Sequence, residues 1–228
     1  LDNKPSTCLG SSDVSLLELV NSFGTVVNEG MYHDPILVTR IEDKNGKVIY
    51  QAATDQKRVI SYETAWLMTE MLKGGMTEPG GTTQALWEWD LFNYNTDFGG
   101  KTGTSSNHSD AWFVGGTKNL IGGAWVGGEH RSVHFRTGQL GEGSRTALPI
   151  FGLFMEKVLK DENFKQYRGK FPAKPKEKIL RSYNCHTYIP RDTTAHDSTS
   201  ADDISLDAIP LEESTSIPAP PTPTKVAP

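Results

Sequence analysis

The sequence predicts an α+β fold that combines an antiparallel sheet with helices and ends in a disordered tail. Three apolar, glycine-dotted segments between residues 97 and 130 have strand length, and their short connections favour antiparallel neighbours. Apolar residues recur at helical spacing on either side of them, over 11–29 and 146–160. From Pro190 onward, too few apolar side chains remain to offset the entropy cost of ordering the chain.

Two helices are predicted before the sheet, and each starts at a capping serine. In the first, within the segment 11–29, Ser15 and Glu18 form a capping box, because each side chain can satisfy a backbone N–H at the helix start. The second helix, over 62–73, begins after Ser61, whose hydroxyl can accept a hydrogen bond from the first turn.

Glycines predict where these elements stop. Gly30 can end the first helix and Gly74-Gly75 the second, since glycine readily adopts the left-handed backbone of helix ends. Between the two helices, residues 36–51 alternate between apolar and polar side chains. Asn45-Gly46 within them favours a tight turn with positive φ, so this segment is predicted to form a hairpin.

The predicted sheet consists of the segments 97–106, 110–117 and 120–130. A closing helix follows over 146–160, with Pro149 tolerated in its first turn. Large apolar side chains from the strands and the closing helix are expected to form the core between them: Trp112, Trp125, Phe151, Phe154 and Met155.

Charge divides the chain into a neutral body and an acidic tail. The formal net charge is −5, and residues 190–228, with two basic and seven acidic side chains, account for all of it. A neutral body lacks the basic footprint that nucleic-acid binding requires. No signal peptide opens the sequence, and no apolar run of about 18 residues could span a membrane. We expect a globular part over 1–160, a basic polar extension over 161–189, and the disordered acidic tail over 190–228.

The segment most informative about chemistry is Lys101-Thr102-Gly103-Thr104. The triplet K-T-G occurs, together with S-x-x-K and S-x-N, in the serine acyltransferases that penicillin inhibits. Taken alone, the tetrapeptide could equally be an ordinary strand with a glycine bulge. Its position on a predicted strand, followed by two more strands, favours the enzymatic interpretation.

The surrounding sequence resembles class A (bifunctional) penicillin-binding proteins over about residues 8–160. The matching pieces include GGKTGTS, DAWFVGGT, GGAWVGG and ALPIFGLFM, and upstream TAWLMTEMLKGGM and GGTTQAL, in the family's order. The resemblance implies the C-terminal part of a transpeptidase domain, related to the serine β-lactamase fold. In that fold, helices cover both faces of a five-stranded antiparallel sheet, of which this chain would supply three strands.

The resemblance also implies a reaction and roles for the motif. A serine attacks a stem peptide ending in D-Ala-D-Ala, D-alanine leaves, and an amine from a second stem peptide resolves the acyl-enzyme. Lys101 would supply positive charge beside the substrate carboxylate, and the hydroxyls of Thr102 and Thr104 would donate hydrogen bonds to it. Gly103 would let the ligand lie against the strand, and the Thr104 N–H would serve the oxyanion hole. β-Lactams would bind the same site, and no cofactor is expected.

The nucleophile motif is absent from this sequence. No serine is followed by a lysine three residues later, and a serine without a neighbouring base is a poor nucleophile at neutral pH. S-x-N occurs at 105–107 and 182–184, at or after the K-T-G triplet rather than before it, so we interpret both as accidental. We expect both missing motifs upstream of Leu1, preceded by a glycosyltransferase domain and a membrane anchor, with the whole enzyme acting outside the cytoplasmic membrane.

Other candidate sites have weaker support. Ser105, Ser106 or Ser109 with His108 and Asp110 could form a triad, but close sequence neighbours on one turn rarely converge. His130, His134 and Glu129 could ligate a metal, although an exposed hairpin end is the simpler interpretation. Residues 141–145 lack phosphate-loop spacing, and the basic residues of 165–181 are expected to be solvated. Cys8 and Cys185 form no metal or redox motif, and the sequence leaves a disulfide between them open.

Two alternative functions are kept beside the transpeptidase. A serine β-lactamase relative would share the triplet, but the upstream resemblance and the acidic, proline-rich tail favour the biosynthetic enzyme. A non-catalytic module that recognises stem peptides or partner proteins would suit a complete chain without a nucleophile. The start at Leu1 rather than Met favours a piece of a longer protein over such a module.

We predict that residues 1–228 fold poorly in isolation. Much of the helical part that carries the nucleophile in the family lies outside this sequence, so apolar surface should be exposed. Thermal unfolding followed by near-UV circular dichroism tests this prediction. A cooperative transition with a native-like tertiary signal would contradict it.

Overall fold

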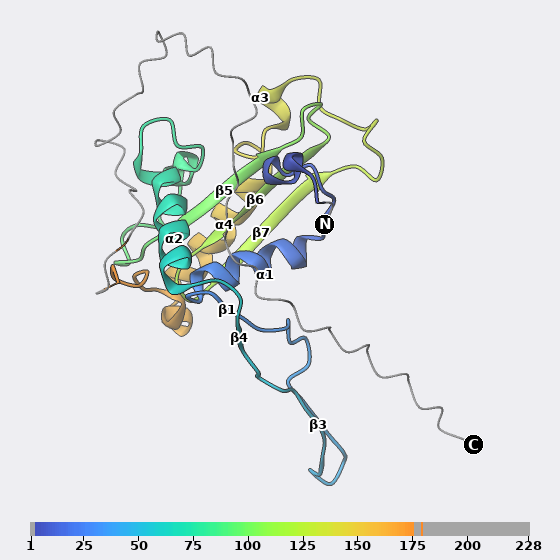
Figure 1. Ribbon diagram of the computed structural model, residues 1–228, viewed down its shortest axis with the longest axis vertical. Coiled ribbons are helices and arrows are strands. Elements are labelled where there is room, and N and C mark those ends of the chain that lie inside the picture. Colours follow the sequence, from blue (N-terminus) through green and yellow to red (C-terminus); the bar gives the residue numbers. More distant parts are fainter. Residues whose placement is uncertain (1–2, 176–178, 180–228) are drawn as a thin grey trace, which may run out of the picture. The chain divides into compact units, whose positions relative to one another are not determined.

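The computed structural model describes residues 3–175 and 179, all within one unit that runs from Leu1 to Tyr183. The predicted tail, 190–228, lies outside the described residues. Figure 1 shows the arrangement of the elements. The helices are η1 (Pro5–Leu9), α1 (Leu16–Val27), α2 (Tyr62–Thr77), η2 (Gln84–Glu88), α3 (Gly138–Gly141), α4 (Ala147–Lys160) and η3 (Glu162–Tyr167). The strands are β1 (Met31–Tyr32), β2 (Arg40–Glu42), β3 (Val48–Gln51), β4 (Lys57–Arg58), β5 (Gly99–Thr104), β6 (Asp110–Gly116) and β7 (Ile121–Gly127).

The main sheet is antiparallel, with the strand order β5-β6-β7, which confirms the three predicted strands. Its register pairs Thr104 with Ala111 at one end of β5 and Gly99 with Gly116 at the other. The next pairing joins Phe113 of β6 to Ala124 of β7. Within the described residues, β5 therefore forms an edge of this sheet.

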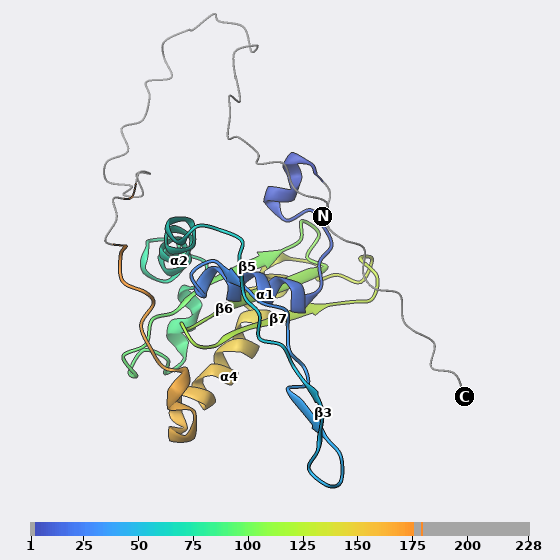
Figure 2. The same ribbon diagram turned by 60° about the horizontal axis from the view of Figure 1, so that its bottom comes forward.

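Helices cover both faces of the sheet, as Figures 1 and 2 show from two directions. On one face, α2 packs so closely on Gly99 that a Cβ there would lie 3.1 Å from the Leu72 Cβ. On the same face, Gly123 lies under Leu16 and Val20 of α1. On the other face, α4 brings Phe151 against Phe113, with ring centroids 4.7 Å apart. Gly99 and Gly123 thus face one side of the sheet and Phe113 the other, because successive residues of a strand point to opposite faces.

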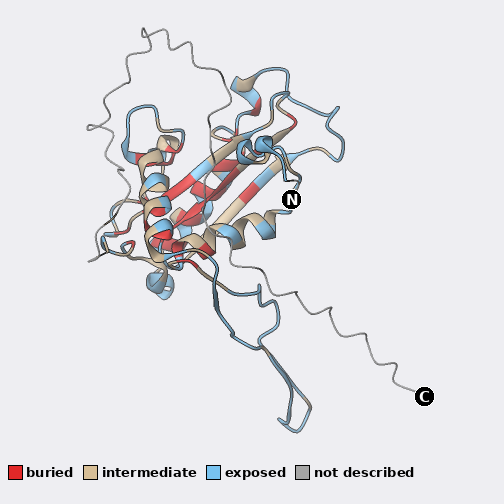
Figure 3. Cartoon of the chain, viewed as in Figure 1, coloured by how far each residue is buried: buried red, intermediate tan, exposed pale blue. Residues whose placement is uncertain are grey.

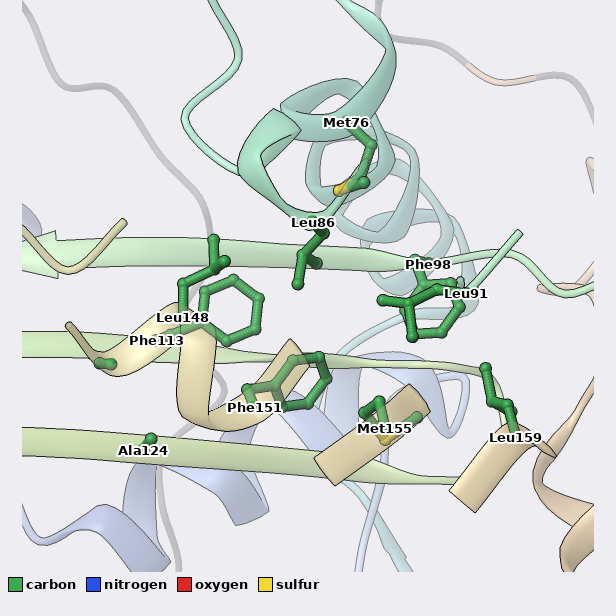
Figure 4. Packing of buried hydrophobic residues seen from close by; sticks show 11 residues of the cluster. Met76, Leu86, Leu91, Phe98, Phe113, Ala124, Leu148, Phe151, Met155 and Leu159 are labelled. Atoms are coloured by element: carbon green, nitrogen blue, oxygen red, sulfur yellow. The ribbon is translucent and has the colours of Figure 1, made fainter. Parts of the chain in front are cut away.

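The hydrophobic core lies between the sheet and α4, as the close-up in Figure 4 shows. Phe113, Leu148, Met155 and Leu159 are fully buried there. Of the five core side chains predicted from sequence, Phe151 and Met155 are confirmed. Trp125 and Phe154 are not core residues, because they are 42% and 52% exposed. Trp125 lies on the opposite face of the sheet from α4. Trp112, directly across the ladder from Trp125, is only partly buried.

Both predicted helix starts are confirmed, but the predicted end of the second helix is wrong. Ser15 and Glu18 form the capping box of α1, and the Ser61 hydroxyl accepts the Thr64 N–H at 3.2 Å. The helix α2 continues through Gly74-Gly75 to Thr77. Packing explains this, because a Cβ on Gly75 would lie 2.8 Å from the Thr83 hydroxyl and 3.3 Å from the Gly100 carbonyl. Gly75 therefore permits a close helix–strand contact instead of ending the helix.

The predicted hairpin is present, but it is short and solvent-exposed. The strands β2 and β3 pair antiparallel with a register shift between Ile41 and Glu42. The turn spans Asp43 to Lys47 and has positive φ only at Gly46, so it is wider than the tight Asn45-Gly46 turn predicted. Figure 3 shows that the hairpin projects from the body with almost every residue exposed.

Residues 161–175, predicted as part of a solvated basic extension, pack against the body of the domain. The Thr117 hydroxyl donates to the Tyr167 carbonyl at 2.7 Å, and Lys170 forms an ion pair with Asp97 at 2.9 Å. Phe171 is buried. Arg168 donates to the Leu159 carbonyl, so this basic side chain is largely withdrawn from solvent, whereas Lys165 and Lys170 are exposed as predicted.

The loop before β5 is also attached to α4. The Asp90 N–H donates to the Glu156 carboxylate at 3.0 Å, and Lys160 lies 3.2 Å from the same oxygen. The hydrogen bond from Asp90, supported by Lys160, holds the pKa of the Glu156 carboxyl below its usual range.

Two buried threonines on the α2 side give a stability prediction. Thr83 is fully buried, and its hydroxyl has no hydrogen-bond partner among the described residues, whereas the hydroxyl of Thr69, which is also buried, donates to the Ala65 carbonyl at 2.9 Å. Thr83→Val should therefore stabilise this region by about 1 kcal/mol and slow amide hydrogen exchange over residues 62–104 roughly 5-fold. Thr69→Val, the matched control, should speed exchange. Faster exchange in Thr83→Val would show that its hydroxyl has a stabilising role.

Candidate active site around Lys101

All four residues of the predicted motif lie on β5, the edge strand. Lys101 and Thr104 are exposed, and Thr102 and Gly103 are partly buried. The preceding residues Gly99 and Gly100 are buried beneath the end of α2, so only the second half of the strand is open.

The hydrogen-bond ladder determines which backbone groups face the open edge. The Ser105 N–H donates to the Asp110 carbonyl at 3.0 Å, just beyond the last β5–β6 pair. Bonded and non-bonded pairs alternate in antiparallel ladders, so Gly103 and Lys101 also bond to β6. The backbone N–H and C=O groups of Thr102 and Thr104 then point away from β6, towards the open edge. The Lys101 ammonium donates to the Thr102 carbonyl at 2.9 Å, which agrees with this assignment.

The Lys101 side chain is held at this edge by a residue from another loop. Its Nζ lies 3.3 Å from the hydroxyl oxygen of Thr82, which precedes η2. The Thr102 hydroxyl also donates to the Thr82 oxygen, at 2.9 Å. Lys101, Thr102 and Thr82 thus form one cluster of polar groups beside the open strand edge.

A glycine from the loop after α3 contacts the far end of the motif. The Gly143 N–H donates to the Thr104 hydroxyl at 3.0 Å. A Cβ on Gly143 would lie 2.4 Å from the Trp112 carbonyl and 2.6 Å from the Gly103 carbonyl, so only glycine allows this approach. The Thr104 hydroxyl accepts this bond and keeps its own hydrogen available for a ligand.

Sequence reasoning missed Thr82 and Gly143. Thr82 lies in GGTTQAL and Gly143 in GEGSR, and neither segment has a spacing that points to a site. For Thr82, the signal was present only as part of the family resemblance, where no role was assigned to it. Both residues reach Lys101-Thr102-Gly103-Thr104 through tertiary contacts that no local pattern reveals.

The other sequence candidates do not form catalytic sites in the described residues. The Ser105 hydroxyl accepts the N–H groups of Ser109 and Asp110 at 3.0 and 2.9 Å, so it stabilises the turn after β5. The buried Nδ1 of His108 has no partner among the described residues, and no serine–histidine pair forms there. This supports the interpretation of the S-x-N match at 105–107 as accidental, and the match at 182–184 lies outside the described residues.

The described part of the chain shows no group of three or more His, Cys, Asp or Glu side chains that could hold a metal ion, and this includes Glu129, His130 and His134. None of the helices within 3–175 has both the length and the apolar character that a membrane span needs. Cys8 is exposed, and Cys185 lies outside the described residues.

Comparisons with known proteins agree with this geometry. The profile of the penicillin binding protein transpeptidase domain matches residues 2–126. Penicillin-binding protein 1A of Clostridium novyi is 31% identical over 144 residues, covering 63% of this chain and 15% of that protein. Penicillin-binding protein 1A of Rickettsia felis is 29% identical over 182 residues, covering 71% of this chain and 23% of that protein. The chain therefore spans less than a quarter of the length of these relatives.

Solved structures show the same fold. PonA1 from Mycobacterium tuberculosis, solved in complex with penicillin V, superposes with a TM-score of 0.61 at 25% identity over 76% of this chain and 44% of its own. Penicillin-binding protein 1A from Haemophilus influenzae gives a TM-score of 0.61 at 23% identity over 71% and 28% of the two chains. With the family profile covering more than half of the sequence, the chain belongs to the transpeptidase-domain family of the penicillin-binding proteins, and its resemblance to the class A members is confirmed.

Proposed function

We propose that residues 1–228 supply the K-T-G side of a serine D,D-transpeptidase site that cross-links the stem peptides of peptidoglycan. The observation that carries this proposal is the position of the Lys101 ammonium, which lies at the open half of an edge strand beside outward-facing backbone groups of Thr102 and Thr104. A peptide that ends in a carboxylate can use both features at once.

The open edge suits an extended peptide ligand. Exposed strand edges bind peptides through main-chain hydrogen bonds, and Thr102 and Thr104 offer the unpaired groups for this. Lys101 supplies a charge-assisted hydrogen bond to the terminal carboxylate, and the Thr104 hydroxyl can donate another. Gly103 has no side chain that could stand between the strand and a ligand. A Cβ there would also approach the Trp112 Cβ to 3.1 Å.

The reaction is an acyl transfer in two steps. A serine oxygen attacks the carbonyl carbon of the penultimate D-alanine, the peptide C–N bond breaks, and D-alanine leaves with a proton on its amine. An amine of a second stem peptide then attacks the ester, and the serine oxygen leaves and regains its proton. The outward N–H of Thr104 can stabilise the oxyanion in both steps, and donors of this kind contribute about 2.7–4 kcal/mol in other enzymes.

The nucleophile must come from outside residues 1–228, because no S-x-x-K occurs within them. The chain is therefore inactive alone in this proposal. The whole protein would also carry a glycosyltransferase activity, as the resemblance to the bifunctional class implies. Its site would face the outside of the cytoplasmic membrane, where the stem peptides are, and β-lactams would acylate the same serine.

A β-lactamase relative and a non-catalytic peptide-recognition module are the competing functions. Both could retain Lys101 at an open strand edge. The three functions differ in their response to penicillin, since a β-lactamase releases the acyl group by hydrolysis, a transpeptidase retains it, and a non-catalytic module forms no covalent adduct.

Covalent labelling with a fluorescent penicillin tests the proposal. The reagent is mixed with residues 1–228 and, separately, with the longest natural polypeptide that contains them, and both are then denatured and separated by electrophoresis. We expect label on the long polypeptide alone, blocked by unlabelled ampicillin and stable after excess reagent is removed. Label on residues 1–228 would mean that a serine within them is activated. Rapid loss of label with penicillin hydrolysis would favour the β-lactamase, and an unlabelled long polypeptide would favour the module.

Replacement of the lysine tests the role of the motif. In the long polypeptide, Lys101→Gln should lower the second-order rate constant of acylation by roughly 10- to 150-fold, because hydrogen bonds to charged groups contribute about 1.5–3 kcal/mol. Lys118→Gln is the matched control, since Lys118 is an exposed lysine in the turn between β6 and β7, outside the open edge of β5 and its K-T-G motif. Equal rate constants for Lys101→Gln and the unaltered protein would remove Lys101 from the site.

A further inference from the structure

We propose that Thr82 is a positioning residue, which holds Lys101 and Thr102 in the arrangement that receives the carboxylate of the substrate. This inference rests on the proposed transpeptidase function and adds a residue from outside the K-T-G strand to that site.

The Thr82 hydroxyl oxygen is the point where the two motif side chains meet. It lies 3.3 Å from the Lys101 Nζ and 2.9 Å from the Thr102 Oγ1. The direct distance between Lys101 Nζ and Thr102 Oγ1 is longer, at 3.5 Å. Thr82 therefore connects the two groups more closely than they connect to each other.

The loop that carries Thr82 is held in place by the residues next to Thr82, not by the Thr82 side chain. The Thr83 N–H donates to the Gly75 carbonyl at 3.2 Å, and the Gln84 side-chain amide donates to the Glu78 carbonyl at 2.7 Å. A Cβ on Gly81 would lie 2.2 Å from the Gly75 carbonyl oxygen, so the loop presses directly on the end of α2. Thr83 is fully buried beneath it. The Thr82 side chain is thus presented to the motif by a loop that does not need it.

The contacts of Thr82 restrict a side chain that would otherwise move freely. A lysine ammonium has three donors on a flexible stem, and the Thr102 carbonyl engages one of them at 2.9 Å. The Thr82 oxygen accepts a second, and the third makes only a long 3.5 Å contact to the Thr102 hydroxyl, which a carboxylate can replace. It also accepts the Thr102 hydroxyl proton and so fixes the direction of that group until a carboxylate competes for it. Loss of this oxygen should therefore weaken recognition of the carboxylate and spare reactivity towards a ligand without one.

The test compares two ligands that differ only at the carboxylate, a penicillin and its methyl ester, as acylating agents of the long polypeptide. In Thr82→Val, which keeps the shape but loses the hydroxyl, the ratio of the two acylation rate constants, acid over ester, should fall about 3- to 10-fold, the loss expected for one hydrogen bond. Thr82→Ser, which keeps the hydroxyl, should restore the ratio. Thr83→Val, which changes the adjacent residue in the same loop, should leave it unchanged.

The outcomes separate this inference from the proposed function. An unchanged ratio in Thr82→Val, or an equal fall for acid and ester, would overturn the positioning role while Lys101→Gln still showed a defect. Failure of the unaltered long polypeptide to be acylated, or full activity of Lys101→Gln, would overturn the proposed function itself and this inference with it.

Discussion

The contact between the end of α2 and the first half of β5 is the constraint on which the candidate site depends. Gly75 and Gly99 lack side chains where the helix meets the strand, and a Cβ at either of them would come within about 3 Å of a neighbouring atom. This close approach buries the start of an edge strand that would otherwise be open along its length. The same contact ends at Lys101, so the uncovered half of the edge coincides with the motif.

The register of the sheet gives this uncovered half its chemistry. A shift of one residue between β5 and β6 would turn the backbone groups of Thr102 and Thr104 into the ladder and present those of Lys101 and Gly103 instead. The register is held by the buried face, where Phe113 packs on Phe151 of α4 and Ala124 lies opposite it. The core therefore does more than stabilise the domain, because it decides which amide groups meet a ligand.

Local patterns predicted the elements well where one signal acts alone. The capping box at Ser15 and Glu18, the three strands and the K-T-G motif were all apparent in the sequence. The pattern failed where a tertiary contact competes with it. Gly74-Gly75 looks like a helix end, but Gly75 serves packing. Trp125 looks like a core residue, but it lies on the face of the sheet away from α4, with its indole N–H donating to Asp110 at 3.1 Å. Thr82 and Gly143 could not be found, because their significance arises only when loops 19 and 39 residues away in sequence meet β5.

The segment after α4 gives the domain a mechanical property. Lys170 and the Phe171 N–H both bind the carboxylate of Asp97, and Asp97 lies two residues before β5. The Asp97 N–H in turn donates to the Gly169 carbonyl at 3.0 Å. Because Phe171 is also buried, a load applied to the chain at residue 175 would act on the buried body and, through Asp97, on the segment that leads into the motif strand at the same time.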